Sequence, residues 1–413
     1  MNGPLKGYRV LELSRILAGP WAGQLLADFG AEVIKIERPG SGDDTRRWGP
    51  PFLNNVDNER PGESAYFLST NRNKRSVAID FSKPEGQRLV AEMAGQSDVL
   101  IENFKVGTLA RYGLDYASLS QRNPALVYCS ITGFGQTGPY AEHAGYDAAV
   151  QAMGGLMSLT GLPDDQPGGG PQKVGVAVAD LMAGMYAANA IQAALIHRQQ
   201  TGRGQYIDLA LFDTQIAWLA NQASNYLVSG QVPGRQGSAH PNIVPYQAFA
   251  TADGHLMLAV GNDAQFARFA RLAGHEGWAT DARFSENRAR VAHRETLVPM
   301  ISEVMAARST QDWLAKLRAA GVPAAPINNL ADVFADPQVE ARGMVQHLPH
   351  PQHPELPTVA NPVRFSETPV SYRRAPPLLG ADTADVLEQV LGLDRSRMED
   401  LERDGVIGME GGA

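Results

Sequence analysis

One carboxylate stands out because apolar and small residues surround it. Asp180 lies between the apolar run Val174–Ala179 and the segment Leu181–Met185. An aspartate in this place is typical of a helix N-cap, and it is also suited to nucleophilic attack. A helix N-terminus would hold the carboxylate ionised, and Ala183 and Gly184 would leave room for a substrate. The residues alone leave both roles open.

Basic side chains follow two of the expected strands. Arg38 comes directly after a strand at Glu32–Glu37, and Lys105 and Arg111 follow one at Val99–Asn103. Because ligands of open parallel sheets bind beyond the carboxyl ends of the strands, these side chains could hold a phosphate. A solvated loop arginine is the alternative for Arg38. Together the basic residues favour an anionic small-molecule ligand over a neutral one.

Two other patterns suggest cofactor or metal chemistry, and their surroundings argue against it. The glycines of Gly133–Gly138 fit a dinucleotide fingerprint, but Pro139 follows at once and no helix is expected to open there. His347, His350 and His353 recur at every third position among prolines, which indicates a solvated loop rather than a metal site. No G-x-S-x-G elbow is present in the sequence, so a serine hydrolase has little support.

The bulk composition is that of an ordinary globular protein, with 44% hydrophobic and 19% charged residues. Its 413 residues predict two domains, and its net charge of −8 argues against a nucleic-acid partner. The single cysteine, Cys129, excludes an internal disulfide, and its place in an apolar run indicates a packed core thiol. No apolar run reaches the roughly 20 residues of a membrane span, and we expect a cytoplasmic protein.

The N-terminal third alternates between strands and helices, which predicts an α/β fold with a large doubly wound, Rossmann-like parallel sheet. Near residues 230–320 a strand pair around Asp253 and Gly254 precedes several helices, which predicts a smaller α+β domain. We expect Pro349–Pro377 to be an extended connection. The expected strands of the sheet are Tyr8–Leu13, Glu32–Glu37, Ser76–Phe81, Val99–Asn103, Ala125–Thr132 and Tyr206–Leu211. The expected helices are Trp21–Phe29, Pro84–Gly95, Asp180–Gln199, Asp213–Leu227 and Gly380–Leu393.

An ordered set of short motifs covers nearly the whole chain. In this set the sequence resembles the class III coenzyme A transferases, which include formyl-CoA transferase. The motifs are Leu17–Pro20, Gly30–Arg38, Asn73–Ser76, Glu102–Phe104, Gly145–Asp147, Asp180, Thr201–Gln205 and Pro377–Gly380. It is most similar to the succinyl-CoA:dicarboxylate subgroup, on the basis of Gly40–Arg46, Trp48–Phe52, Tyr128–Gly133, His240–Phe249 and Pro326–Asn329.

The resemblance implies that Asp180 is a covalent nucleophile that passes through an anhydride and an aspartyl-CoA thioester. It implies no tightly bound cofactor and no metal; a CoA thioester is the co-substrate and a carboxylic acid the acceptor. It also implies an interlocked homodimer. The domains would be a large one at 1–208 and 361–413, a small one at 227–330, and linkers at 209–226 and 331–360.

The family's site residues carry over onto matching positions of this sequence. The expected CoA contacts are Ala18, Arg38, Ile79, Ser82, Asn103, Phe104, Lys105, Arg111 and Tyr146. The expected contacts near the reacting acyl group are Tyr66, Asp147, Gly237, Ser238 and His240.

The substrate acid is left open between several dicarboxylates and 3-sulfinopropionate. Leu17 and Ala144 replace a glutamine and a lysine of formyl-CoA transferase, and the flap is no longer all glycine, which argues against formate and oxalate. A dicarboxylate needs a cationic or donor-rich patch for its distal carboxylate. The candidates are Arg15, Arg47, Arg72 and His240.

Two alternatives belong to other functional classes. An α-methylacyl-CoA racemase has a related fold, but its histidine is replaced here by Tyr146, whose pKa of about 10 makes it a poor base. A catalytically silent CoA-binding protein would keep Arg38 and Asn103 and would not require Asp180.

Overall fold

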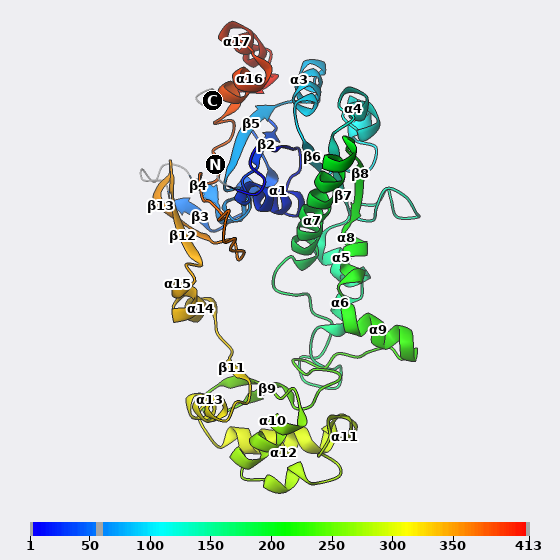
Figure 1. The fold of residues 1–413 in the computed structure, drawn as a ribbon, viewed down its shortest axis with the longest axis vertical. Coiled ribbons are helices and arrows are strands. Elements are labelled where there is room, and N and C mark those ends of the chain that lie inside the picture. The colour runs from blue at the N-terminus through cyan, green and yellow to red at the C-terminus, as the bar shows by residue number, and fades with distance from the viewer. Residues whose placement is uncertain (1–2, 55–60, 410–413) are drawn as a thin grey trace. The chain divides into compact units, whose positions relative to one another are not determined.

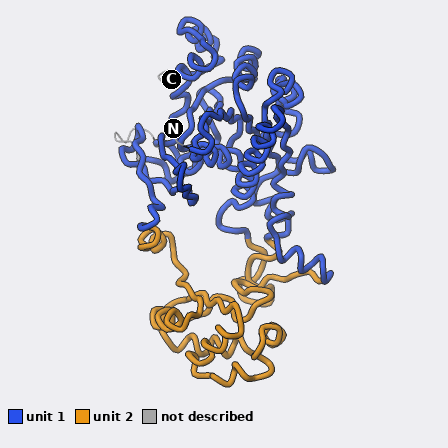
Figure 2. Tube along the Cα trace, in the orientation of Figure 1, with its two compact units in different colours: residues 1–156, 173–230, 340–413 blue, residues 157–172, 231–339 orange. Residues whose placement is uncertain are grey.

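The computed structural model describes residues 3–54 and 61–409. They form two compact units (Figure 2). One unit contains the residues up to 156 together with 173–230 and those from 340 onward, and the other contains 157–172 and 231–339. The segments 209–226 and 331–360, expected as linkers, are largely made of regular helices and strands.

The first unit is built on a seven-stranded sheet (Figure 1). Its strands are β1 (Arg9–Glu12), β2 (Glu32–Glu37), β5 (Lys74–Ile79), β6 (Val99–Glu102), β7 (Val127–Thr132), β8 (Tyr206–Ala210) and β14 (Ile407–Gly408). Their order is β14-β5-β2-β1-β6-β7-β8, and all neighbours are parallel except the short edge strand β14. The predicted α/β class and the predicted strands are confirmed, with ends that differ by at most two residues.

Helices cover both faces of this sheet, as a doubly wound fold requires. They are α1 (Ala18–Asp28), α3 (Pro84–Gly95), α4 (Tyr116–Arg122), α5 (Asp147–Met153), α7 (Val178–Thr201), α16 (Thr383–Leu391) and α17 (Arg395–Arg403). Val10 and Val33 belong to a core with α1 and α7. Leu11 and Ile34 belong to a second core with α3, α4, α16 and α17. Neighbouring residues of one strand thus enter opposite cores, because side chains alternate along a strand.

Two expectations about connecting segments are wrong. The helix expected at Asp213–Leu227 is two helices, α8 (Leu211–Ala217) and α9 (Ala220–Ser229), and neither glycine nor proline marks the break between them. The connection expected at Pro349–Pro377 contains β13 (His353–Val359), which pairs with β12 (Val345–His350). The prolines are tolerated because both strands of a two-stranded sheet are edge strands. His350 is buried in this hairpin and not solvated.

The second unit has an antiparallel sheet of β9 (Tyr246–Ala250), β10 (His255–Ala259) and β11 (Ala324–Pro326), so the strand pair expected around Asp253 is confirmed. Phe266, Phe269 and Trp313 form its core together with the buried face of the sheet. Its helices are α10 (Asp263–Leu272), α11 (Asn287–Ala292), α12 (Arg294–Ala306), α13 (Thr310–Ala319) and α14 (Leu330–Phe334).

Short elements complete the described chain. They are η1 (Asp44–Arg47), β3 (Phe52–Asn54), β4 (Pro61–Ser64), α2 (Ala65–Leu68), η2 (Leu109–Tyr112), α6 (Leu156–Leu159), η3 (Glu276–Ala279) and α15 (Pro337–Ala341). None of the helices in the described ranges combines the length and apolar character that a membrane span needs.

Candidate active site

Asp180 lies in the first turn of α7, and it is not the N-cap. The N-cap is Ala177, so Asp180 is the third helical residue. Within the described chain no hydrogen bond or ion pair engages the Asp180 carboxylate, which is only partly exposed. The N-cap prediction is wrong, and the carboxylate is left available for chemistry.

Asp147 supplies the cap from a neighbouring helix. Its Oδ2 accepts hydrogen bonds from the N–H groups of Ala179 at 2.8 Å and Asp180 at 3.4 Å. Gln151, one turn further along α5, donates to Asp147 Oδ1 at 2.6 Å and accepts from Val174 N–H at 3.0 Å. A side chain from α5 thus satisfies amides that every helix start leaves free, and it fixes the turn that carries Asp180.

Helices α1 and α7 pack closely one helical turn beyond Asp180. A Cβ on Gly184 would lie 2.6 Å from the carbonyl oxygen of Ala18 and 3.0 Å from Trp21. The absence of a side chain therefore lets α1 approach α7 one turn below Asp180. Ala183 is buried in the same interface. The expectation that Ala183 and Gly184 leave room for a substrate is wrong, because α1 fills that space.

A cavity of about 350 Å³ opens beside Asp180 at the carboxyl ends of the strands. Ala18 follows β1, Asn103 and Phe104 follow β6, and Gly133 follows β7. Gly133 passes so close to Gly145 that a Cβ on it would lie 2.5 Å from the Gly145 Cα. Gly133, the first glycine of the dinucleotide-like pattern, is therefore required because two backbone segments pass in close contact there. The next helix begins only at Asp147, which confirms that no phosphate-binding helix opens after this pattern.

The pKa of Asp180 is raised to about 7, first by burial and second by the negative charge of Asp147. The helix N-terminus was expected to hold this carboxylate ionised, whereas burial and the like charge of Asp147 favour its protonated form. The pKa of Tyr66 is raised to about 12 by burial and by the charges of Asp180, Asp147 and Asp43. Tyr66 thus lies within the electrostatic reach of the candidate nucleophile.

A second cavity, also of about 350 Å³, lies along the same edge of the sheet. It is lined by Arg38, which follows β2, by Ile79 at the end of β5, and by Ser82 after β5. Arg15 and Phe104 line both cavities, so the two adjoin. Together they form an elongated site, which suits a long ligand with an anionic end near Arg38 and a reacting end near Asp180.

Most predicted contact residues lie in this pair of cavities. The first is lined by Ala18, Asn103, Phe104, Lys105, Tyr146 and Asp147, and the second by Arg38, Ile79, Ser82 and Phe104. Arg111 lies in η2 and is not among the lining residues of either cavity.

Gly237, Ser238 and His240, which are expected near the reacting acyl group, belong to the second unit. The Ser238 hydroxyl accepts a hydrogen bond from Ala248 N–H at 3.0 Å. The ring of His240 accepts one from Asn242 N–H at 3.0 Å. Gly237 has a φ of 58°, which favours glycine there.

Arg72 does not fit the expected role in holding a substrate carboxylate. It is buried, and its guanidinium pairs with Asp28 through Nε at 3.0 Å and Nη2 at 2.6 Å. Nη1 donates to the Val359 carbonyl at 2.8 Å. Because the guanidinium already has these partners, Arg72 is a structural ion pair. Arg15, by contrast, is exposed at the cavities and pairs with Asp44.

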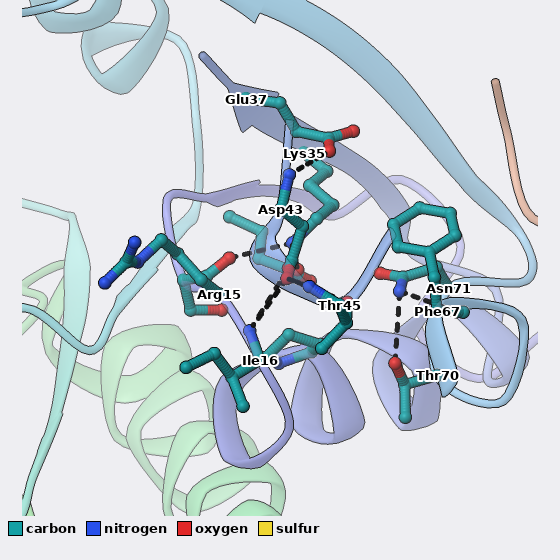
Figure 3. A network of polar contacts seen from close by, with 12 residues as sticks. Arg15, Ile16, Lys35, Glu37, Asp43, Thr45, Phe67, Thr70 and Asn71 are labelled. Atoms are coloured by element: carbon teal, nitrogen blue, oxygen red, sulfur yellow. Dashed lines mark hydrogen bonds and ion pairs between the residues drawn. The ribbon is translucent and has the colours of Figure 1, made fainter. Parts of the chain in front are cut away.

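Sequence reasoning missed a buried ionic network that borders the second cavity through Lys35 and Asp43, both labelled in Figure 3. Lys35 bonds Asp43 at 2.9 Å and Glu12 at 3.1 Å. Lys74 forms an ion pair with Glu12, in which its Nζ lies 2.9 Å from Oε2 and donates a hydrogen bond to Oε1 at 3.0 Å. Charged residues inside strands β1, β2 and β5 were the available signal, since lysine and glutamate are rarely buried unless paired.

The described residues contain no group of three His, Cys, Asp or Glu side chains arranged to hold a metal ion. His350 is buried in the hairpin of β12 and β13, where its ring accepts a hydrogen bond from Gln352 N–H at 3.1 Å. Cys129 is fully buried in β7, as expected for a packed core thiol. Burial raises the pKa of its thiol, which makes it a weak nucleophile.

The molecule is thus a doubly wound α/β protein with a carboxylate cavity at the carboxyl ends of its strands, and residues 5–383 match the model of CoA-transferase family III. The chain belongs to this family and is a CoA-transferase, an enzyme that uses CoA thioesters as co-substrates. The succinate–glutarate CoA-transferase of Agrobacterium fabrum is 52% identical over 393 residues, covering 95% of this chain and 97% of that protein. The succinyl-CoA:glutarate CoA-transferase of Mus musculus is 45% identical over 404 residues, covering 98% and 90%.

A solved structure has the same fold. The crystal structure of a CAIB/BAIF family protein from Brucella suis superposes with a TM-score of 0.83 at 51% sequence identity. The match covers 94% of this chain and 100% of that chain. The predicted family resemblance is therefore confirmed in sequence and in fold.

Proposed function

We propose that this enzyme transfers CoA from succinyl-CoA to a short dicarboxylate, with Asp180 as the covalent nucleophile. The observation that carries the proposal is the Asp180 carboxylate itself. It lies in a cavity without a side-chain partner among the described residues, and a second cavity with Arg38 adjoins. The relatives from Agrobacterium fabrum and Mus musculus are named for succinate or succinyl-CoA and for glutarate, which supports this pair of acids.

The reaction proceeds through two kinds of covalent intermediate. An oxygen of ionised Asp180 attacks the thioester carbon and forms a mixed anhydride of succinate and Asp180. The C–S bond breaks, and its electron pair leaves on the CoA thiolate. The thiolate then attacks the Asp180 carbonyl carbon of this anhydride and expels succinate, which leaves an aspartyl-CoA thioester. The acceptor carboxylate repeats both steps in reverse order and restores Asp180. A weak carboxylate nucleophile suffices because a thioester and an anhydride are both activated.

The bound CoA extends along the sheet edge in this proposal. Arg38, which is exposed and has no ion-pair partner in the described ranges, holds a phosphate of CoA. Ile79 and Ser82 line the adenine pocket. The thioester reaches Asp180 between Ala18, Phe104 and Tyr146.

The acceptor's far carboxylate needs a cation in reach of the first cavity. Arg15 is the candidate that lines this cavity. Its present partner, Asp44, is exposed, so a substrate carboxylate can replace that solvated ion pair at small cost. Glutarate is the first acceptor to test, and itaconate, citramalate and 3-sulfinopropionate are the others.

The protein forms a homodimer in this proposal. Helices α7 and α9 carry large apolar side chains that are exposed in the single chain, and a second copy would cover them. These residues are Met185, Tyr186, Ile196, Tyr226, Leu227 and Val228.

A donor and acceptor panel tests the proposed function. Purified enzyme with succinyl-CoA is supplied with each short dicarboxylate and with 3-sulfinopropionate, and the CoA esters are separated by mass spectrometry. Glutaryl-CoA formation with matching succinate release is expected. The absence of transfer to every acid would refute the proposal, and deuterium uptake at the α-carbon of a 2-methylacyl-CoA would favour a racemase instead.

A further inference from the structure

A β-branched residue takes a strained backbone conformation at the edge of the Asp180 cavity. Ile16, between β1 and α1, has a φ of 72°. This left-handed region suits glycine and asparagine, and for a β-branched residue it is an outlier that persists only when its surroundings enforce it. The turn from Arg15 to Ala18 lines the cavity that contains Asp180. A strained turn therefore forms part of the reacting site.

Three buried side chains form hydrogen bonds with the backbone just before, within and just after this turn. Lys35 Nζ donates to the carbonyl of Ser14 at 2.8 Å. The N–H of Ile16 donates to both carboxylate oxygens of Asp43, at 3.2 Å each (Figure 3). Lys74 Nζ donates to the carbonyl of Pro20 at 2.8 Å. The contacts lie before, at and after the strained residue.

The holding groups are themselves tied into one buried network. Lys35 pairs with Asp43 at 2.9 Å, and Glu12 bridges Lys35 and Lys74. The N–H and hydroxyl of Thr45 donate to Asp43 Oδ1 at 3.0 and 2.8 Å. Each charge is paired and hydrogen-bonded, which a buried ion requires. Such a network is rigid and costly to rearrange.

Asp43 stays ionised over the whole working range of pH. Burial would raise the pKa of its carboxyl, but Lys35 and the Thr45 hydrogen bonds lower it to about 2. Burial would likewise lower the pKa of Lys35, and the charges of Asp43, Glu12 and Glu37 raise it instead. The Asp43 carboxylate, which accepts the hydrogen bond from the Ile16 N–H, thus carries a full negative charge at any pH at which Asp180 reacts.

We propose that Asp43 is a positioning residue for CoA transfer, which holds Ile16 in its left-handed conformation and so keeps the Arg15–Ala18 backbone in place opposite Asp180. This inference rests on the proposed function, because the distance between that backbone and Asp180 matters only for chemistry at Asp180. Asp43 itself lines the adjoining cavity and does not line the one that contains Asp180.

The first test compares Asp43→Asn with Glu63→Gln. Glu63 pairs with Arg46 in the same buried region, and no hydrogen bond or ion pair within the described chain joins its side chain to the turn. Asp43→Asn keeps the shape and loses the charge, and we expect kcat to fall about 10- to 100-fold with less than a threefold change in the acceptor KM. Glu63→Gln is expected to lower the melting temperature and leave kcat within twofold. Equal kcat values for the two variants would overturn the proposal.

The second test asks whether Asp43 acts through the strain at Ile16. Asparagine adopts a left-handed φ more readily than isoleucine does. In an Ile16→Asn background, Asp43→Asn is therefore expected to cost less than threefold in kcat. The same loss in both backgrounds would show that Asp43 does not act through this turn.

Two further readouts do not depend on catalysis. Hydrogen exchange followed by mass spectrometry should be faster in the peptide containing Ile16 when Asp43 is replaced, whether or not CoA is transferred. If Asp43→Asn does not fold, Ile16→Asn should still melt a few degrees above Ile16→Val, which keeps the β-branch. An unchanged exchange rate or equal melting temperatures would contradict the inference, whereas failure of the acid panel alone would contradict only the proposed function.

Discussion

At the scale of single residues, the Asp180 carboxylate is the group on which the proposed chemistry depends. Its carboxylate has no side-chain partner in the described chain, and burial followed by the charge of Asp147 raises its pKa to about 7. A carboxylate that is poorly solvated is a better nucleophile than one in water, but only its ionised fraction reacts. The same two causes therefore give this site both its reactivity and a dependence on pH.

The pH profile of kcat/KM should follow the ionisation of Asp180. We expect kcat/KM to be constant above pH 8 and to fall about tenfold per unit well below pH 7. Asp147→Asn keeps an acceptor for the α7 amides and removes a like charge, so it should move the acid limb to lower pH. Initial rates between pH 5 and 9 measure this, with Glu92→Gln on the exposed face of α3 as the control. An unmoved limb in Asp147→Asn would contradict the electrostatic explanation.

The raised pKa of Asp180 also predicts an effect on stability. The unfolded chain loses this proton near pH 4 and the folded chain near pH 7, so ionisation destabilises the fold as the pH rises through that window. Asp180→Asn should therefore raise the free energy of unfolding by about 4 kcal/mol at pH 8 and change it little at pH 4. Urea unfolding at both pH values measures the difference. An equal effect at both pH values would contradict the raised pKa.

At the scale of elements, the approach of α1 to α7 sets the width of the site. The bare Cα of Gly184 faces the Ala18 carbonyl, and the first turns of both helices border the cavity. A change here alters the distance between Ala18 and Asp180 without removing a reacting group. The packing of two helices is thus part of the active-site geometry.

Gly184→Ala should lower both stability and activity. The new methyl meets backbone at 2.6 Å, which costs about 1–3 kcal/mol and pushes the helices apart. Gly95→Ala is the matched control, because its Cβ would meet nothing within 4 Å at the end of α3, and it should be neutral or slightly stabilising. Thermal unfolding and kcat measure both variants. If Gly184→Ala and Gly95→Ala change the melting temperature and kcat equally, the close approach of α1 to α7 does not matter for stability or activity.

The strands and the long helix of the sheet could be predicted from the sequence, whereas the contacts that cap and interrupt the helices could not. Apolar runs such as Val99–Glu102 fix buried strands, and the long helix expected from Asp180 was found at Val178–Thr201. The cap at Asp147, by contrast, comes from 33 residues away and depends on tertiary contact. The break between α8 and α9 was missed because no glycine or proline marks it.

At the scale of the whole molecule, the exposed apolar side chains of α7 and α9 support a dimer. Leu227 and Val228 are 79% and 89% exposed, which a monomeric protein rarely tolerates for adjacent large apolar residues. Leu227→Glu with Val228→Glu should shift the protein toward monomer, and Leu330→Glu in the second unit serves as a control of similar exposure. Light scattering coupled to size-exclusion chromatography measures the mass. A wild-type monomer would contradict the proposed assembly.

The ordered motifs of the sequence were sufficient to predict the family. They also identified Arg38, Phe104 and Tyr146 as site residues, and these residues line two adjoining cavities. They could not reveal that Arg72 is tied to Asp28 or that the start of α1 is strained, because both depend on the angles and partners of the folded chain. Prediction from sequence thus reached the family and the enzyme class, and it missed the tertiary contacts that support the candidate site.

The central claim, covalent catalysis by Asp180, is tested most directly by trapping its acyl intermediates. The enzyme is incubated with succinyl-CoA, treated with hydroxylamine and digested, and the peptide that contains Asp180 is analysed by mass spectrometry. We predict a hydroxamate on Asp180 that forms only with succinyl-CoA and is absent in Asp180→Ala, which transfers no CoA. Undiminished transfer by Asp180→Ala, or modification at another residue alone, would contradict the account.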